Sequence, residues 1–156
     1  MFLKKYQQKR EFSKTPEPKG SSKSYALSHK QIFVIHDHYA RQHHHDLRLE
    51  RDNVLKSWAL PKLTPEKGEK HLAIQVEDHP LEYAKFTGKI PEGEYGAGEV
   101  KIFDRGTYEI IHQTDKTIEF ELFGKKLSGI WALVQLKDKK NWLFFKTSKK
   151  SGGANA

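Results

Sequence analysis

The chain consists of short runs of β-branched and aromatic residues separated by turn-forming residues. The breaks between runs hold Gly, Pro, Asn or Asp, and no run has the length and the period of about 3.6 residues of an amphipathic helix. The pattern therefore predicts an all-β fold. The expected strands are residues 32–35, 47–49, 54–60, 72–76, 100–103, 118–122, 130–136 and 142–145.

A chain of 156 residues is long enough for one hydrophobic core. Because closure removes exposed sheet edges, we expect a small closed or nearly closed β-barrel of about eight strands. A two-sheet sandwich is the alternative. The expected organisation is a basic, irregular N-terminal arm at residues 1–30, the barrel at 31–147 and a flexible tail at 148–156.

Positive charge is concentrated at both ends of the chain, whose formal net charge is +8. Residues 1–30 carry eight Lys or Arg and two Glu, and residues 137–150 carry six Lys and one Asp. Residues 31–136 carry 14 basic and 17 acidic side chains. Cationic ends on a slightly acidic body suit a polyanion such as nucleic acid, although lysine-rich ends also serve solubility.

The composition narrows the functional classes. The sequence has no Cys, which excludes disulfides, thiolate zinc sites and cysteine nucleophiles. The N-terminal sequence MFLKKYQQKR has no apolar run of signal-peptide length, and the chain is too polar for a bilayer-spanning segment. We therefore expect a cytoplasmic, monomeric protein with no membrane partner.

Five of the nine histidines lie within residues 36–46, the sharpest chemical feature of the sequence. In a protein without Cys, imidazole and carboxylate are the usual ligands of zinc and manganese. A His-rich surface turn, or an adventitious metal binder, is the alternative. The five are His36, His38, His43, His44 and His45.

Strand alternation sorts these side chains by face. His44 and Asp46 point to one side of a strand with Arg48 one step farther on, while the leucines between them point to the other. His36 and His38 share a face in the same way. Two adjacent strands can therefore bring His38, His44 and Asp46 to one metal. A guanidinium beside a metal suits a phosphate, although Arg48 and Asp46 can also form a simple ion pair.

At these residues the sequence closely resembles the 3′-phosphoesterase family, known as the N-terminal domain of bacterial DNA ligase D and as stand-alone bacterial and archaeal proteins. Ordered blocks carry the resemblance over nearly the whole chain. They are KREF (9–12), TPEP (15–18), HYARQHHHDLRLE (38–50), LKSWALPK (55–62), VEDHPLEY (76–83), IPEGEYGAG (90–98), KLSGIW (126–131) and WL (142–143).

The resemblance implies a small β-barrel that uses a divalent metal, typically manganese with zinc or cobalt as alternatives, to trim 3′ ends in end-joining repair. Family members remove a 3′-terminal ribonucleoside from a primer strand and then hydrolyse the 3′-phosphate that remains. The implied partners are DNA or RNA/DNA primer-template 3′ ends and a separate ligase and polymerase. The family's metal ligands fall on His38, His44 and Asp46. Its phosphate-handling residues fall on Arg48, Lys62, His79 and Tyr83, and arm residues needed for activity on Arg10, Glu11 and Glu17.

Four positions depart from the usual family pattern. His36 and Asp37 replace Gln-Lys, His45 replaces an aromatic residue, and His71 replaces Arg. His36 is therefore a candidate additional ligand, and His71 a weaker phosphate anchor than Arg. These changes bear on the balance between the diesterase and monoesterase steps.

The chemistry of phosphoester hydrolysis suggests a role for each of these residues. Arg48 and Lys62 hold phosphoryl oxygens, Tyr83 hydrogen-bonds the phosphate, and His79, if protonated, is a general acid. Glu17 or Glu11 orients Arg10 or a ribose hydroxyl. The glycine segment 93–98 is expected to be a tight turn and not a phosphate loop. The aromatics Trp58, Trp131, Trp142, Phe144 and Phe145 are assigned mostly to the core.

Two other functions fit the same residues. A non-catalytic nucleic-acid-binding barrel would use the histidines to hold a structural metal, and its fold would melt on chelation. A hydrolase of small phosphate esters would turn over mononucleotides and duplex ends alike.

Overall fold

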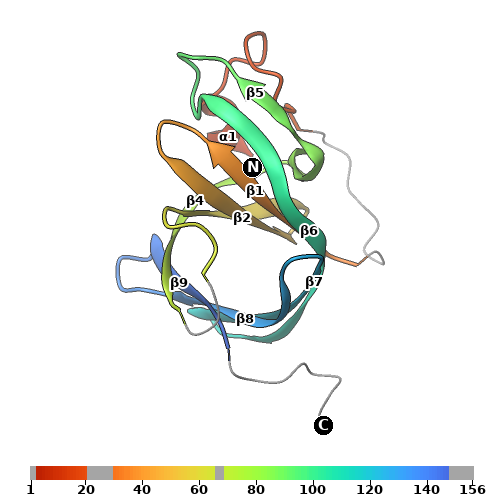
Figure 1. The fold of residues 1–156 in the computed structure, drawn as a ribbon, viewed down its shortest axis with the longest axis vertical. Coiled ribbons are helices and arrows are strands. Elements are labelled where there is room, and N and C mark those ends of the chain that lie inside the picture. Colours follow the sequence, from red (N-terminus) through yellow and green to blue (C-terminus); the bar gives the residue numbers. More distant parts are fainter. Residues whose placement is uncertain (1–2, 21–29, 66–68, 148–156) are drawn as a thin grey trace.

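The computed structural model describes residues 3–20, 30–65 and 69–147 (Figure 1). The expected tail at 148–156 and residues 21–29 of the arm lie outside the described residues. The described strands are β1 (Ile32–Tyr39), β2 (His43–Arg51), β3 (Val54–Leu60), β4 (His71–His79), β5 (Gly88–Ile90), β6 (Gly98–Gln113), β7 (Thr117–Gly124), β8 (Ser128–Gln135) and β9 (Asn141–Lys146).

Eight of these described strands close into an antiparallel barrel in the order β1-β2-β3-β4-β9-β8-β7-β6, with β6 paired back onto β1. The length of β6 makes the closure, because residues 99–107 pair with β1 and residues 106–113 pair with β7. The extra strand β5 pairs with the beginning of β6. The prediction of a closed β-barrel is therefore confirmed over the sandwich.

Seven of the eight predicted runs lie within one barrel strand each, and the eighth, residues 130–136, extends one residue beyond β8. The sequence did not predict β5, the short helix α1 (Lys4–Gln8) or the 3-10 helix η1 (Leu81–Lys85). The predicted strand that corresponds to β6 ends at residue 103, whereas β6 itself continues for ten more residues, to 113. The described part of the arm is otherwise irregular, as expected. None of the helices in the described residues has the length and apolar character needed to cross a membrane.

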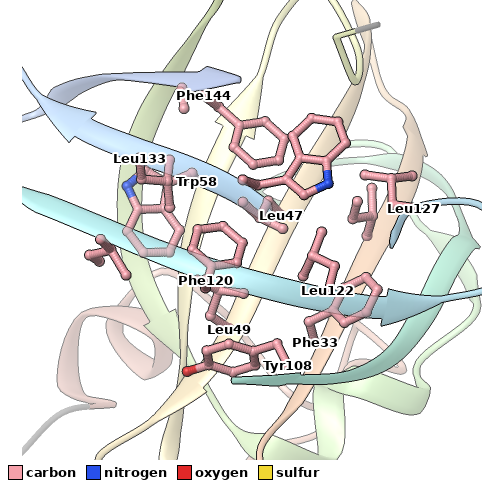
Figure 2. Close-up of a cluster of buried hydrophobic side chains, with 14 of the residues drawn as sticks. Phe33, Leu47, Leu49, Trp58, Tyr108, Phe120, Leu122, Leu127, Leu133 and Phe144 are labelled. Carbon is pink, nitrogen blue, oxygen red and sulfur yellow. The ribbon is translucent and has the colours of Figure 1, made fainter. Parts of the chain in front are cut away.

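The barrel interior is filled by buried apolar side chains (Figure 2). The ring of Trp58 meets that of Trp142 edge-on at 5.7 Å, and Trp131 stacks on Phe144 at 4.8 Å. Burial stabilises the fold by about 1.5–3 kcal/mol for each large apolar side chain. These four aromatics lie in the core as expected, whereas Phe145 is only partly buried beneath Lys70.

A second apolar cluster lies on the outer face of the barrel. It joins Val34 of β1 and Leu55 of β3 to Tyr6 of α1 and Tyr83 of η1. Tyr6 is fully buried, and its hydroxyl donates a hydrogen bond to the carbonyl of Pro18. The N-terminal arm is therefore packed onto the barrel, and it covers the outward face of the β1–β2 hairpin.

The glycine segment forms the expected turn between β5 and β6. Gly93, Gly96 and Gly98 have φ values of +90°, +77° and +134°. A Cβ atom on Gly98 would lie 2.1 Å from the carbonyl oxygen of Tyr39, so only glycine allows the two backbones to approach this closely. The turn is thereby held against the end of β1, where His38 lies.

Candidate active site

The outward face of the β1–β2 hairpin carries the polar residues singled out in the sequence. Across the two strands His38 pairs with His44, and His36 pairs with Asp46. Leu47 and Leu49 point to the opposite side, into the barrel. Strand alternation therefore predicted correctly which side chains share a face, and the structure shows that this face is the outer one.

The side chains of His38, His44 and Asp46 converge. His38 Nδ1 lies 3.4 Å from Asp46 Oδ2, and His44 Nε2 lies 3.3 Å from Asp46 Oδ1. The other ring nitrogens face backbone carbonyls, which only accept hydrogen bonds. His38 Nε2 donates to Gly96 O at 2.7 Å, and His44 Nδ1 donates to Gln42 O at 3.0 Å.

Because these carbonyls fix which ring nitrogen carries the proton, they determine whether His38 and His44 can bind a metal. In the neutral state, each imidazole carries its proton on the outer nitrogen and turns a lone pair toward Asp46, whose carboxylate also only accepts. The three ligand atoms lie within 4.8 Å of one another. Three lone-pair donors facing one point require either protonated histidine or a cation between them. Two imidazoles and a carboxylate, with the rings oriented by backbone carbonyls, fit a divalent transition metal.

Neighbouring charges set the protonation states of Asp46 and His44. Burial opposes the charge of Asp46, yet the hydrogen bonds that His38 and His44 donate in their protonated forms, together with the nearby Arg48, hold the pKa of Asp46 well below its usual range. Burial likewise opposes charge on His44, but Asp46 raises the pKa of His44 above its ordinary value. The carboxylate therefore remains an anion, ready to bind a cation.

Arg48 lies beside this group and is almost completely buried. Its Nη2 is 3.5 Å from Asp46 Oδ2, and its Nε donates to His36 Nδ1 at 3.1 Å. Its guanidinium also lies 4.8 Å from the ring centroid of Tyr83. The remaining nitrogen, Nη1, is buried without a hydrogen-bond partner among the described residues. A spare buried donor on a cation is suited to an anionic oxygen from a ligand.

His36 does not join the ligand group. Its Nδ1 accepts the hydrogen bond from Arg48, and its Nε2 donates to Phe86 O at 3.1 Å. Burial, followed by the positive charge of Arg48, lowers the pKa of His36 to about 3, so its ring is neutral. Because both nitrogens are occupied, His36 orients Arg48, and the structure does not support it as an additional metal ligand.

The arm contributes a carboxylate that ties two cleft residues together. Glu17 accepts hydrogen bonds from Arg10 Nε at 2.9 Å and from the Tyr83 hydroxyl at 2.7 Å, both at Oε2. Its Oε1 accepts from Thr15 Oγ1 at 2.9 Å. Burial raises the pKa of Tyr83 well above its usual value, so the phenol keeps its proton and acts as a donor.

His79 lies next to Arg10, and its imidazole is neutral. Its Nδ1 donates to Glu77 O at 3.0 Å, and Arg10 Nη2 lies 3.3 Å from its Nε2. Burial and the positive charges of Arg48 and Arg10 hold the pKa of His79 well below its ordinary value. The protonated form expected of a general acid is therefore not the form that these surroundings favour.

Glu77 is a site residue that the sequence reasoning missed. Its carboxylate lies 2.8 Å from Lys9 Nζ and 3.4 Å from Arg10 Nη1, so it holds the arm against β4. Burial opposes the charge of Glu77, but the hydrogen bond from Lys9, a backbone hydrogen bond and the positive charges of Lys9 and Arg10 together lower its pKa. The only signal in the sequence was its place two residues before His79 on a strand, where alternation puts both on one face.

These groups line a cleft of about 280 Å³. A larger hollow of about 590 Å³ lies on another part of the surface beside Ile32 and Leu81, and none of the histidines lines it. Because the converging donors line the smaller cleft, we place the candidate active site there. Of the sequence-predicted residues, the cleft is lined by His38, His44, Asp46, Arg48, His79, Tyr83, Arg10 and Glu17.

The other predicted residues lie outside the cleft lining. Lys62 is exposed in the turn after β3. His71 is partly buried on β4, where its Nε2 lies 3.4 Å from Glu69 and its Nδ1 3.3 Å from the carbonyl of Leu63. Glu11 is exposed and pairs with Lys14 at 3.1 Å. The structure does not bring these three side chains to the converging donors.

A second histidine group lies on the opposite face of the hairpin. Asp37 accepts from His43, and its Oδ1 lies 3.6 Å from His45 Nε2. His45 Nδ1, however, accepts a hydrogen bond from the backbone N–H of Thr64 at 3.0 Å. The proton of the neutral ring is then on Nε2, which faces Asp37. This inner group forms a hydrogen-bonded cluster. It is less suited to a metal than the outer group, which consists of His38, His44 and Asp46.

The fold and the cleft define a small β-barrel protein with a His/His/Asp donor group beside a buried arginine. Residues 36–135 match the family described as the DNA Ligase D 3′-phosphoesterase domain, and the chain belongs to this family.

Relatives agree with this membership. The multifunctional non-homologous end joining protein LigD of Mycobacterium bovis is 50% identical over 138 residues, which cover 85% of this chain and 18% of that protein. The corresponding protein of Mycolicibacterium smegmatis is 46% identical over 90% of this chain and 20% of its own length. That of Pseudomonas aeruginosa is 44% identical over 85% and 16%. The chain thus spans about a fifth of the length of these relatives.

Proposed function

We propose that this protein is a manganese-dependent 3′-end-healing phosphoesterase, which removes 3′-terminal ribonucleosides and then the remaining 3′-phosphate from DNA or RNA/DNA primer strands. The observation that carries the proposal is the unpartnered Nη1 of buried Arg48, which lies beside the converging donors of His38, His44 and Asp46. A cation-binding group and a spare guanidinium donor in one cleft suit a phosphoester.

His38, His44 and Asp46 would hold the metal, with zinc and cobalt as alternatives to manganese. When bound there, the metal would supply Lewis acidity toward a phosphoryl oxygen and lower the pKa of water. Arg48 neutralises a further phosphoryl oxygen. The surrounding carbonyls of Gly96 and Gln42 keep both imidazoles turned toward the centre.

The two proposed reactions differ in the bond that breaks. In the first, water attacks the phosphodiester, the bond to the 5′ oxygen of the terminal ribonucleoside breaks, and that oxygen takes a proton. In the second, water attacks the remaining 3′-phosphate, and its bond to the 3′ oxygen breaks to leave a 3′-hydroxyl and inorganic phosphate. Each leaving oxygen needs a proton donor.

We assign that donor to His79. An anionic phosphate in the cleft offsets the positive charges of Arg48 and Arg10 that disfavour the imidazolium. In the protonated form His79 donates to the leaving oxygen, and the Tyr83 hydroxyl hydrogen-bonds the phosphate. Glu17 keeps Tyr83 and Arg10 in place through the hydrogen bonds that all three share.

We also propose substrate contacts for Lys62, His71 and Glu11, away from the reacting phosphate. Their side chains lie outside the cleft lining, so these contacts would be made beyond the scissile phosphate. The proposed partners are the primer-template 3′ ends themselves and a separate ligase and polymerase that act before and after end healing. We propose that the protein acts as a monomer in the cytoplasm, on DNA ends.

The test is a 5′-labelled primer carrying one 3′-terminal ribonucleotide, annealed to a template and incubated with each divalent metal. We expect a manganese-dependent 3′-phosphate intermediate followed by a 3′-hydroxyl product, both lost in His38→Ala, Asp46→Ala and Arg48→Ala. Intact primers with every metal, together with normal primer binding, would show that the protein is a binding module. Comparable turnover of mononucleotides would identify a hydrolase of small phosphate esters.

A further inference from the structure

A groove of about 580 Å³ continues from the cleft along β4. The cleft and the groove share three lining residues, Val76, Glu77 and Tyr95, so the two hollows are adjacent. Two separate segments provide lysines to the groove: the N-terminal arm, at α1 and the residue that follows it, and the β8–β9 turn, which projects as a blue loop from the side of the barrel (Figure 1). We call this surface the lysine groove; its lysines are Lys5, Lys9, Lys139 and Lys140.

The acidic residues of the lysine groove are already paired. Glu77 contacts Lys9 and Arg10. Asp138 accepts hydrogen bonds from the backbone N–H groups of Lys140 and Asn141 and from the Asn141 side chain, which closes the turn. By contrast, the exposed side chains of Lys5, Lys139 and Lys140 make no ion pair with a described residue. The groove therefore holds four lysines against two carboxylates, Glu77 and Asp138, and carries an excess of positive charge next to the cleft.

Lys139 occupies a backbone conformation that favours glycine. Its φ is +65°, in the left-handed region, and its N–H donates to Leu136 O at 2.9 Å. A lysine here is less favourable than glycine by about 1 kcal/mol. Lys139→Gly is therefore a way to remove the charge without weakening the turn.

Tyr95 stands at the junction of the cleft and the lysine groove. It is 46% exposed, although its ring is large and aromatic. Lys9 Nζ lies 4.7 Å and Arg10 Cζ 5.2 Å from the ring centroid. An exposed aromatic ring beside cations matches the stacking platforms that proteins present to nucleobases.

We propose that the lysine groove binds the phosphate backbone of the strand whose 3′ end occupies the cleft, and that Tyr95 stacks on a base where the strand passes from groove to cleft. The inference rests on the proposed function, because the cleft defines which end of the strand is held. It adds a path for the rest of the strand, several phosphates away from the scissile bond.

The first test measures binding of a fluorescent primer-template with a 3′-hydroxyl end as a function of salt. The groove variant is Lys5→Gln, Lys139→Gly, Lys140→Gln, and the matched control is Lys85→Gln, Lys116→Gln, Lys125→Gln, whose exposed lysines lie outside both cleft and groove. We expect the groove variant to bind at least about tenfold more weakly at about 0.1 M salt, and its salt slope to fall by about 3. Unchanged binding, or equal weakening in both variants, would overturn the proposal.

A second measurement maps the direction of the strand. Because the chain has no Cys, Lys139→Cys introduces a single thiol for a photocrosslinker. We expect crosslinks to the primer nucleotides nearest the 3′ end, and none from Lys116→Cys. Crosslinks spread evenly along the duplex would contradict the proposed path. If the phosphoesterase proposal alone is wrong, no primer is shortened, yet the groove variant still binds more weakly than the control.

Discussion

Arg48 and His36 form a directed pair on the outer face of the barrel, in which Arg48 Nε donates to His36 Nδ1 across 3.1 Å. The other nitrogen of His36 donates to Phe86 O at 3.1 Å, so the ring cannot rotate without losing both bonds. The pair fixes the guanidinium beside Asp46 and leaves Nη1 free for a ligand. His36 is therefore a positioning residue for Arg48.

This relationship predicts that glutamine can replace His36. The amide oxygen of His36→Gln can accept from Arg48 while its NH₂ donates to Phe86 O, so we expect activity within about threefold of the parent. His36→Leu leaves the buried Arg48 Nε unpaired, at a cost of about 1–3 kcal/mol. We expect it to lose at least about tenfold in kcat/KM. Equal activities of the two variants in the primer assay would refute the positioning role.

The two faces of the hairpin give a matched test of the metal site. Asp46→Asn removes the carboxylate of the group formed with His38 and His44 on the outer face. Asp37→Asn makes the same change in the group formed with His43 and His45 on the inner face. We expect Asp46→Asn to weaken manganese binding by more than about 100-fold and to abolish turnover. Asp37→Asn should leave both nearly unchanged. Calorimetric titration with manganese measures the affinities, and a reversed order would place the metal on the inner face.

Chelation of the metal distinguishes a catalytic metal from a structural one. A catalytic metal leaves the apo-protein folded, because the barrel core is built without it. We expect chelator to stop primer processing while the melting temperature falls only modestly. Collapse of the folded signal on chelation would instead favour the structural-metal alternative.

Strand periodicity could predict the barrel and the face that His38, His44 and Asp46 share, because both follow from patterns of residues that are close in the sequence. His38 and His44 face each other since the hairpin pairs them directly. The sequence could not predict the cover over this face. The five-residue helix α1 is too short to show periodicity, and it is held by the buried Tyr6 in the second apolar cluster. That cover is what desolvates His79 and makes it neutral.

Substitutions of Glu17 and Glu11 show which carboxylate of the N-terminal arm has a structural role. The side chain of Glu17 is buried and accepts from Arg10, Tyr83 and Thr15, whereas that of Glu11 is exposed and forms an ion pair with Lys14. Glu17→Gln should lose about 1.5–3 kcal/mol of unfolding free energy together with activity. Glu11→Gln should lose less than about 0.5 kcal/mol. Urea unfolding gives both values. If Glu11→Gln abolishes turnover at full stability, Glu11 acts on the substrate directly.

The neutral state of His79 makes folding stability depend on pH. Its pKa is well below 6.5 in the folded protein and about 6.5 in the unfolded chain, so below that pH the unfolded state binds the extra proton. Stability is therefore retained above about pH 6.5 and falls on acidification, by up to about 1.4 kcal/mol per pH unit from this one group. His79→Gln should reduce that slope, and the exposed His112→Gln should not. Equal slopes for the parent and His79→Gln would contradict the assignment.

Tyr95 should influence substrate binding more than the chemical step. The ring lies at the junction of cleft and lysine groove, and base stacking on an aromatic is worth about 1–3 kcal/mol. Tyr95→Ala should therefore raise KM for a primer by about fivefold to 100-fold with little change in kcat, whereas Tyr95→Phe, which keeps the ring, should behave like the parent. A substrate too short to reach the junction, such as a 3′-phosphorylated mononucleoside, should be processed equally by all three. A fall in kcat for Tyr95→Phe would instead assign the hydroxyl, 3.4 Å from Lys9 Nζ, a part in the reaction.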